Sequence, residues 1–235
     1  MQLFYSPEIH KEQKQFAFSK EESKHIVKVL RKTIGDVLNI TNGKGDLFTA
    51  EISNADIKNC VVTIVAFETQ KPLSYHLHLA VAPTKMNDRF EWFLEKATEI
   101  GVTEITPILC DHSERKVIKT ERFEKILQAA MKQSLSCYLP KLNEAIPYKD
   151  FIKQAFRGDL FIAHCEETDR KSLKKMLKPE KDITLLIGPE GDFSVKEIEN
   201  ALVNNFIPVT LGETRLRTET AAIVACHSVA FVNEI

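Results

Sequence analysis

The chain has 235 residues, of which 43% are hydrophobic and 28% charged, an ordinary composition for a globular protein of one or two domains. Its formal net charge of -1 gives no indication of a nucleic-acid partner, so any RNA affinity has to come from a local basic patch. The five scattered cysteines without a C-x-x-C pair favour a reducing compartment over a disulfide framework or a zinc site. No signal peptide and no bilayer-spanning apolar run is recognisable, and we expect a cytoplasmic protein without a membrane partner.

Residues 1–69 have the pattern of a small β domain. Ser19 and Glu22 predict the capped start of one helix that runs through Val29. The Asn42–Gly45 stretch lacks the spacing of a phosphate-binding loop, and it predicts a hairpin turn. The strand candidates are Leu3–Tyr5, Phe16–Phe18, Asp36–Ile40, Leu47–Ile52 and Cys60–Phe67.

Beyond Pro72 the pattern changes to strands that alternate with helices, which predicts a parallel α/β domain. Ser194 and Glu197 form a second capping box, with Val195, Ile198 and Leu202 at helical spacing behind it. The expected strands are 75–82, 103–109, 159–164, 183–187 and 207–211, and the expected helices are 87–100, 120–134, 169–177, one that starts after 194, and 220–232. The last helix is apolar almost all round and has to be buried on several sides.

Two glycine-containing loops follow the last two strands of this pattern. One is Gly188–Gly191; the other begins at Gly212 and carries Arg215 and Arg217. Each glycine alone is well explained as a turn residue. Together, at the exits of two strands and beside two arginines, they predict a ligand site of the open α/β kind.

The same stretches resemble a known family. GPEGDFS at 188–194, followed by LG-x-x-x-LRTETA at 211–221, resembles the C-terminal signature of the SPOUT methyltransferases. The branch it resembles is the RsmE family, which methylates N3 of a uridine in small-subunit (16S) ribosomal RNA. His25-x-x-x-Val29-Leu30-Arg31 and the segment 96–102 extend the resemblance over nearly the whole chain. The chain departs from the family in three places. It has Asp192 where the family has glycine, and Gln-Ser-Leu-Ser at 133–136 where the family has Gln-x-Gly-Arg. It also lacks an arginine that the family often has just after the start of the chain.

The resemblance implies a PUA-like β-barrel RNA-binding domain over residues 1–69 and a SPOUT α/β domain over residues 73–235. It also implies a trefoil knot near the C-terminal end, whereas general topology rules predict an unknotted sheet. The implied partners are small-subunit ribosomal RNA or the ribosomal subunit, and a second copy of the chain in a homodimer. No metal is implied. The implied methyl donor is S-adenosylmethionine, with these binding residues: His164, Ile187, Gly188, Pro189, Glu190, Gly191, Leu211, Gly212, Leu216, Thr218 and Ala221.

In the LRTET loop the resemblance places Arg217 and Glu219 beside the methyl group. Arg217 is expected to stabilise negative charge that develops on the uracil. Glu219 is expected to orient Arg217 or accept a proton, and an equal alternative is that it only holds the loop and caps the last helix. Candidate RNA contacts are Arg31, Lys32, Arg115 and Lys116.

Other chemistries have weaker support in the sequence. His76 and His78 share a strand face but lack a third metal ligand, and acidic neighbours of Cys165 oppose a catalytic thiolate. The adjacent Asp111, His112 and Ser113 lack the surroundings of a hydrolase triad. Two alternative functions stay open: a SPOUT methyltransferase that acts on another RNA, for example at a ribose 2′-hydroxyl, and an RNA-binding module without catalysis. A Rossmann-type enzyme is the weakest candidate because G-x-G-x-x-G is missing.

Overall fold

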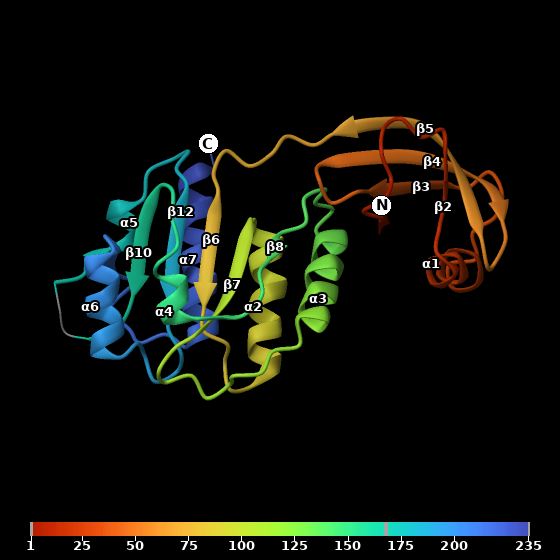
Figure 1. Ribbon diagram of the computed structural model, residues 1–235. Helices are drawn as coiled ribbons and strands as arrows, with labels where there is room; N and C mark the ends of the chain where they lie inside the picture. The colour runs from red at the N-terminus through yellow and green to blue at the C-terminus, as the bar shows by residue number, and fades with distance from the viewer. Residues whose placement is uncertain (1, 167–168, 235) are drawn as a thin grey trace. The chain divides into compact units, whose positions relative to one another are not determined.

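In the computed structural model, which describes residues 2–166 and 169–234, the chain forms two compact units (Figure 1). Unit 1 comprises Met1–Pro72 and Met131–Leu139, and unit 2 comprises Leu73–Ala130 and Pro140–Ile235. The segment 131–139 therefore belongs with the N-terminal strands, although its place in the sequence is within the α/β pattern.

Backbone hydrogen bonds attach the segment 131–139 to the rest of unit 1. The amide of Leu139 donates to the carbonyl of Gly43 at 2.9 Å, and the amide of Gly45 donates to the carbonyl of Cys137 at 2.8 Å. The ring of Tyr138 lies so close to Gly45 that a Cβ there would collide with it. Gly45 thus allows a close approach of a distant segment in addition to forming the hairpin turn.

Unit 1 contains a five-stranded sheet in the order β1-β3-β4-β5-β2. Its pairs are antiparallel except for β1 and β3, which are parallel. The buried aromatic and aliphatic side chains of this sheet and its helix form one core that includes Phe4, Ile26 and Phe48. The strands are β1 (Leu3–Tyr5), β2 (Gln15–Ala17), β3 (Val37–Thr41), β4 (Asp46–Ala55) and β5 (Cys60–Thr69), within one or two residues of prediction except at the C-terminal end of β4.

The helical segment of unit 1 begins where its sequence predicts. Ser19 accepts a hydrogen bond from the amide of Glu22 at 3.2 Å and caps α1 (Lys20–Lys24). The carboxylate of Glu22 lies 3.5 Å from His25, so the structure forms only one half of the predicted capping box. The chain continues as a π-helix, η1 (His25–Val29), and Arg31 follows with a φ of 55°.

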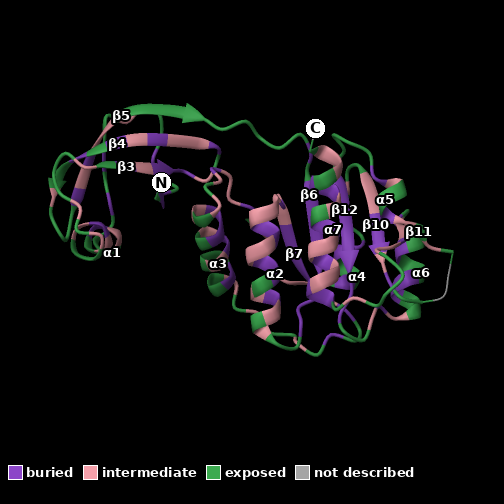
Figure 2. Cartoon of the chain, turned by 180° about the vertical axis from the view of Figure 1, so that it is seen from behind, coloured by how far each residue is buried: buried purple, intermediate pink, exposed green. Residues whose placement is uncertain are grey.

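Unit 2 is built on an eight-stranded sheet that contains the path β11-β13-β10-β12-β6-β7-β8, with β9 paired to β7. All of its pairs are parallel, as the alternating pattern predicts. The central strands β6 and β12 are buried along their whole length (Figure 2). The strands are β6 (Leu77–Val81), β7 (Glu104–Leu109), β8 (Lys141–Leu142), β9 (Ile146–Pro147), β10 (Asp159–Ala163), β11 (Lys171–Ser172), β12 (Ile183–Ile187) and β13 (Ile207–Thr210).

Helices cover both faces of this sheet. Figures 1 and 2 show α4 and α6 on one face and α2 and α7 on the other. Ala222, Ala225 and Val229 of α7 are buried inside unit 2, whereas Phe231 is 61% exposed, so the apolar helix buries one side within its own unit. The helices are α2 (Asn87–Ile100), α3 (Thr120–Gln133), α4 (Tyr148–Phe151), α5 (Leu173–Met176), α6 (Val195–Val203) and α7 (Thr218–Asn233).

One local prediction in unit 2 was wrong. The predicted helix over 169–177 shortens to α5, because β11 occupies the residues just before it as a parallel edge strand. In α6 the predicted capping box of Ser194 and Glu197 is present, but Val195 and Leu202 are exposed and only Ile198 of the predicted stripe is buried. The helix is short and covers the sheet with a narrower stripe than its spacing suggests.

Within the described part of the chain, no helix combines the length and the apolarity needed to cross a lipid bilayer.

Candidate cofactor site

A cavity of about 400 Å³ opens at the carboxyl ends of three neighbouring strands, β10, β12 and β13. Parallel strands bring their carboxyl ends to one edge of a sheet, so the loops after Ala163, Ile187 and Thr210 meet there. Every predicted cofactor-binding residue except Gly191 lines this cavity. These lining residues are His164, Ile187, Gly188, Pro189, Glu190, Leu211, Gly212, Leu216, Thr218 and Ala221, and Arg217 lines the cavity as well.

Glycine is required for different structural reasons at the three glycine positions of the two loops. A Cβ on Gly188 would lie 3.0 Å from the ring of Phe193, and one on Gly191 would lie 3.2 Å from Cβ of His112. Both glycines therefore allow close packing within the protein. Gly212 has a φ of +152°, and a Cβ there would meet no heavy atom within 4 Å, so its own side of the cavity wall is open.

Asp192 also lines the cavity, although the sequence analysis did not include it among the binding residues. Its φ is 63°, a left-handed conformation that glycine adopts freely and aspartate tolerates better than most residues. Its carboxylate accepts hydrogen bonds from the amide of Cys165 at 2.6 Å and from the amide of Phe193 at 2.8 Å. Asp192 therefore ties the loop after β10 to the loop after β12, a role that glycine cannot perform.

His164 is the buried polar side chain of the cavity that has no partner in the described protein. It is 5% exposed, and neither its Nδ1 nor its Nε2 has a hydrogen-bond partner. Burial lowers the pKa of His164, which favours the neutral imidazole. A buried imidazole without partners is unfavourable, so a ligand that offers it a hydrogen bond would stabilise this arrangement.

Charges of both signs surround the cavity. Acidic side chains come from Glu190, Asp192 and Glu213, and basic side chains from Arg170, Arg215 and Arg217. Arg170 was not predicted as a site residue because its loop matches no motif. A ligand that carries separate positive and negative groups suits such a lining.

The loop before α7 places Arg217 and Glu219 in different surroundings. Thr218 anchors this loop by donating from Oγ1 to the carbonyl of Gly188 at 3.1 Å. Within residues 2–166 and 169–234, the guanidinium of Arg217 has no hydrogen-bond or ion-pair partner, and it lines the cavity. Glu219 is buried away from it, with Oε1 at 3.9 Å from Nε of Arg89 and Oε2 without a partner.

The four predicted RNA contacts are divided between the two units. Arg31 and Lys32 lie in unit 1, just beyond η1. Arg115 lies in unit 2, where its guanidinium donates to the carbonyls of Thr84 and Lys85 at 3.2 and 2.7 Å. Lys85 in turn donates its amide to Glu190 at 2.9 Å. Arg115 thus braces a loop beside the cavity.

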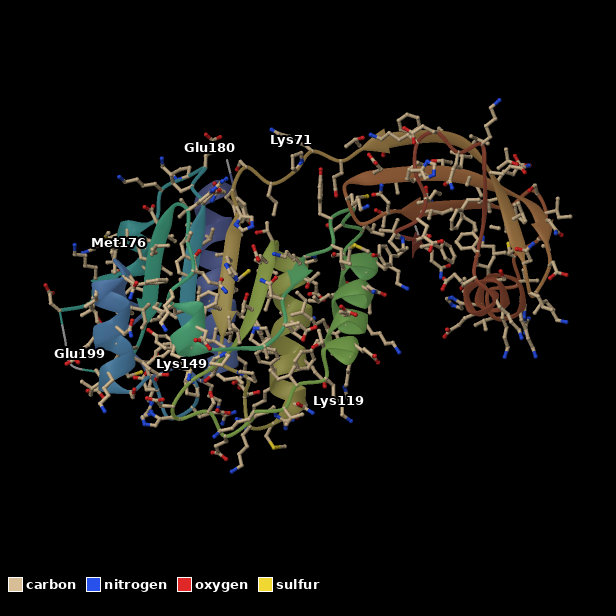
Figure 3. The ribbon with its side chains drawn as sticks, in the orientation of Figure 1. Lys71, Lys119, Lys149, Met176, Glu180 and Glu199 are labelled. Atoms are coloured by element: carbon tan, nitrogen blue, oxygen red, sulfur yellow. The ribbon has the colours of Figure 1, made fainter. Side chains whose placement is uncertain are left out.

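Lys116 lines a second cavity of unit 2, of about 490 Å³, together with Lys149 and Lys196. Lys149 is labelled on α4 in Figure 3. Asp111 and Glu197 line the same cavity, so its charge is mixed, and the three lysines are the groups in it that suit a phosphate.

The side chains of Asp111, His112 and Ser113 contact other groups. Asp111 accepts from Oγ of Ser194 at 2.7 Å, and Ser113 accepts from the amide of Cys110 at 2.9 Å. Nδ1 of His112 lies 3.0 Å from the carbonyl oxygen of Asp192. In the part of the chain that the structure describes, no group of three or more His, Cys, Asp or Glu side chains is arranged to hold a metal ion.

The chain resembles known proteins over nearly its whole length. Residues 70–230 match the family described as an RNA methyltransferase domain, and residues 18–65 match an RNA methyltransferase PUA domain. The ribosomal RNA small subunit methyltransferase E of Buchnera aphidicola subsp. Acyrthosiphon pisum is 34% identical over 224 residues, which cover 90% of this chain and 86% of the relative.

Solved structures of RNA methyltransferases are also similar to this chain over nearly its whole length. The crystal structure of a probable rRNA-methyltransferase from Porphyromonas gingivalis has a TM-score of 0.91 and 42% identity, and covers 99% of this chain and 98% of that one. The crystal structure of a ribosomal RNA small subunit methyltransferase E from Neisseria gonorrhoeae bound to S-adenosyl methionine has a TM-score of 0.87 and 26% identity, and covers 99% of this chain and 98% of that one.

Proposed function

This chain belongs to the ribosomal RNA small subunit methyltransferase E family, and we propose that it transfers a methyl group from S-adenosylmethionine to N3 of a uridine in small-subunit ribosomal RNA. The observation that carries the proposal is the cavity at the ends of β10, β12 and β13, where the predicted binding residues meet around an imidazole without a partner.

The lining of this cavity fits S-adenosylmethionine. His164 would offer a hydrogen bond, and the cavity-lining backbone after Ile187 and Leu211 would reach polar edges of the adenine and ribose. Glu190 and Asp192 would favour the positive sulfonium, and the nearby arginines would favour the carboxylate. S-adenosylmethionine supplies, when bound, a methyl group on a positively charged sulfur.

We assign Arg217 the role of stabilising charge on the uracil. N3 of uracil bears a proton that has to leave before or during methyl transfer, and negative charge then spreads to the flanking carbonyl oxygens. The guanidinium of Arg217 keeps a permanent charge, has planar donors and lines the cavity without a protein partner. It can therefore bind the developing anion more tightly than the neutral base.

Glu219 is better explained as a positioning residue than as a proton acceptor. Its carboxylate is buried in the first turn of α7, where the helix dipole favours negative charge, and it faces Arg89 of α2. In this arrangement Glu219 fixes the start of α7, and the neighbouring Thr218 and Arg217 keep their places beside the cavity.

We also propose that unit 1 binds the RNA through the exposed Arg31 and the adjacent Lys32. Lys116 is proposed to contact a phosphate of the RNA at the second cavity of unit 2. The match of residues 18–65 to an RNA methyltransferase PUA domain supports this division between residues 1–69 and 73–235. Arg115 then contributes by bracing the loop of Lys85 and Glu190. We propose a cytoplasmic location, because ribosomal RNA is found in that compartment.

A homodimer and a knotted C-terminal end complete the proposal. The outward face of α7, with Phe231 exposed, and the exposed Trp92 on the neighbouring α2 would be covered by a second copy. The threading of the chain between β12 and α7 as a trefoil knot follows from the family. The contact of Thr218 with Gly188, across these two segments, is consistent with it.

Mass spectrometry of nucleosides tests the reaction. The protein is incubated with small-subunit ribosomal RNA, free or in ribosomal subunits, and S-adenosylmethionine that carries an isotopically labelled methyl group. We expect label on uracil N3. Label on a ribose 2′-oxygen would instead indicate another RNA methyltransferase activity, and absence of label on either substrate would indicate an RNA-binding protein without catalysis.

A further inference from the structure

Unit 1 contains a cavity of about 370 Å³ that the cofactor site and the reaction do not involve. Its walls come from three places in the sequence: the start of β1, the helical segment at Glu22 and His25, and the end of α3. The lining residues are Gln2, Leu3, Phe4, Glu22, His25, Lys132, Gln133 and Leu135. All of them belong to unit 1, so the cavity is a property of that unit alone.

The chemistry of the lining is mixed in a specific way. Leu3 and Phe4 give an apolar floor, and the half-exposed ring of His25 lies with its centroid 6.4 Å from that of Phe4. The amides of Gln2 and Gln133 can each donate and accept hydrogen bonds, and Lys132 adds a positive charge. A flat ring with polar edges and a neighbouring phosphate satisfies all of these groups.

Leu135 has an unusual backbone at the rim of this cavity. The amide of Ser136 donates to the carbonyl of Met131 at 3.1 Å, which makes Leu135 the left-handed residue that ends α3, with a φ of 58°. Glycine is the usual residue at this helix position, and a branched side chain is strained there. Yet Leu135 leaves 38% of its surface exposed, so the fold retains an unfavourable conformation that presents an apolar side chain at the opening.

A second part of the cavity lining has an uncommon backbone too. His25 is the first residue of the π-helix η1, a conformation that occurs in short pieces and often at functional sites. Its Nδ1 lies 3.5 Å from the carboxylate of Glu22, which holds the ring in place. Two uncommon backbone conformations thus position the two side chains that border the cavity.

We propose that this cavity binds one unstacked base of single-stranded RNA, between His25 and Leu135, with the adjoining phosphate on Lys132. The inference rests on the proposed function for the nature of the partner, and residues 18–65, which include His25, match an RNA methyltransferase PUA domain. Stacking on a planar or apolar side chain suits any base, and the two glutamine amides favour a base with free hydrogen-bonding edges.

The test uses Leu135→Gly in the full chain, because this substitution relieves the backbone and removes only the side chain. Glu180→Gly is the matched control: Glu180 has the same φ of 58°, is exposed, lies in unit 2 and is labelled in Figure 3. Fluorescence anisotropy measures the binding of a labelled single-stranded RNA of mixed sequence and of the same strand annealed to its complement. Urea unfolding measures the stability of each variant.

We expect the parent protein and Glu180→Gly to bind the single strand equally and more tightly than the duplex. Leu135→Gly should bind the single strand about tenfold more weakly, and His25→Ala should do the same, while the stability of Leu135→Gly is kept or increased. An unchanged affinity of Leu135→Gly, or equal affinity of the parent for single strand and duplex, would overturn the proposal.

The labelled-methyl assay separates this outcome from the proposed function. Methyl transfer with unchanged RNA affinity in Leu135→Gly would remove the base pocket and keep the reaction. A tenfold loss of RNA affinity in a protein that transfers no methyl group would keep the pocket and remove the reaction.

Discussion

The cofactor cavity of unit 2 and the cavity of unit 1 are built by different means. The cavity of unit 2 lies at the ends of parallel strands, and its walls are loops tied to one another by Asp192 and Thr218. The cavity of unit 1 lies between helix ends, and half-exposed side chains such as His25 and Leu135 form its borders. A small ligand that has to be held in one orientation suits the first, and a flexible polymer suits the second.

Each cavity also contains one residue other than glycine with a positive φ. Asp192 uses its carboxylate to satisfy two backbone amides, so its strain is compensated within the protein. Leu135 has no polar atom in its side chain, and the hydrogen bond from the amide of Ser136 to the carbonyl of Met131 closes the helix end around its left-handed backbone. The side chain of Asp192 thus serves the protein's own backbone, whereas the side chain of Leu135 is partly exposed at its cavity.

The largest expected effect is on Arg217 in the first cavity. Arg217→Ala should lower the rate of methyl transfer by ~100-fold or more, the scale of losing one charge-stabilising donor, while the affinity for S-adenosylmethionine is nearly kept. Raising the pH should partly restore the rate because more uracil is ionised in solution. Single-turnover transfer and calorimetry measure the two quantities, and Arg217→Lys controls for the charge alone. A parent-like rate for Arg217→Ala would contradict this role.

Acid should weaken unit 2 through His78, which lies buried 2.7 Å from Oγ1 of Thr106. Burial lowers its pKa to about 4 from the ordinary value of 6.5. As the pH falls below 6.5 the unfolded chain takes up a proton that the folded chain refuses until about pH 4, so stability is lost across this window. At pH 5 the expected loss relative to pH 8 is about 2 kcal/mol.

The matched variant for this measurement is His78→Gln, which keeps hydrogen-bonding groups near Thr106 but does not titrate. Urea unfolding at pH 8 and pH 5 should show a larger acid loss in the parent than in the variant. Equal losses in the two proteins would mean that His78 does not contribute.

The compensation at Asp192 can be tested by two substitutions. Asp192→Gly keeps the left-handed backbone and loses the carboxylate, whereas Asp192→Ala loses the carboxylate and keeps the strain. The alanine variant should be less stable than the glycine variant by about 1 kcal/mol, and both should be less stable than the parent. If Asp192→Gly unfolds at the same urea concentration as the parent, the two hydrogen bonds do not stabilise the turn.

The smallest expected effect concerns Arg31 in unit 1. Arg31→Ala should weaken RNA binding and reduce the slope of log affinity against log salt by about 1, because one phosphate contact is lost. Titrations at several salt concentrations measure this slope, and Lys58→Ala, an exposed residue of unit 1 away from η1, serves as the control. A parent-like slope in Arg31→Ala would assign the RNA contact to other residues.

The cofactor cavity could be predicted from the sequence because its determinants are local. The strand 183–187, the capping box of Ser194 and the loop of Gly212 each carry their own signal, and parallel pairing brings them together. The side of the sheet on which Glu219 is buried could not be predicted, since a helix with apolar residues almost all round gives no direction.

The cavity of unit 1 could not be predicted for a different reason. The segment 131–139 joins unit 1 through backbone bonds to Gly43 and Gly45, and such long-range pairing leaves no pattern in the local sequence. The left-handed conformation of Leu135 was not predicted either, because leucine is normally a residue of regular helices and strands, although the family has glycine at this position.

The central claim is that the cavity of unit 2 binds S-adenosylmethionine, and calorimetric titration of this compound tests it most directly. Gly212→Val would place a side chain in the open wall of the cavity. The matched control is Gly35→Val in unit 1, since a Cβ on either glycine meets no heavy atom within 4 Å and both glycines have a positive φ. We expect Gly212→Val to bind at least about tenfold more weakly than the parent and Gly35→Val to bind as the parent does. Parent-like affinity in Gly212→Val, or an absence of binding by the parent, would contradict it.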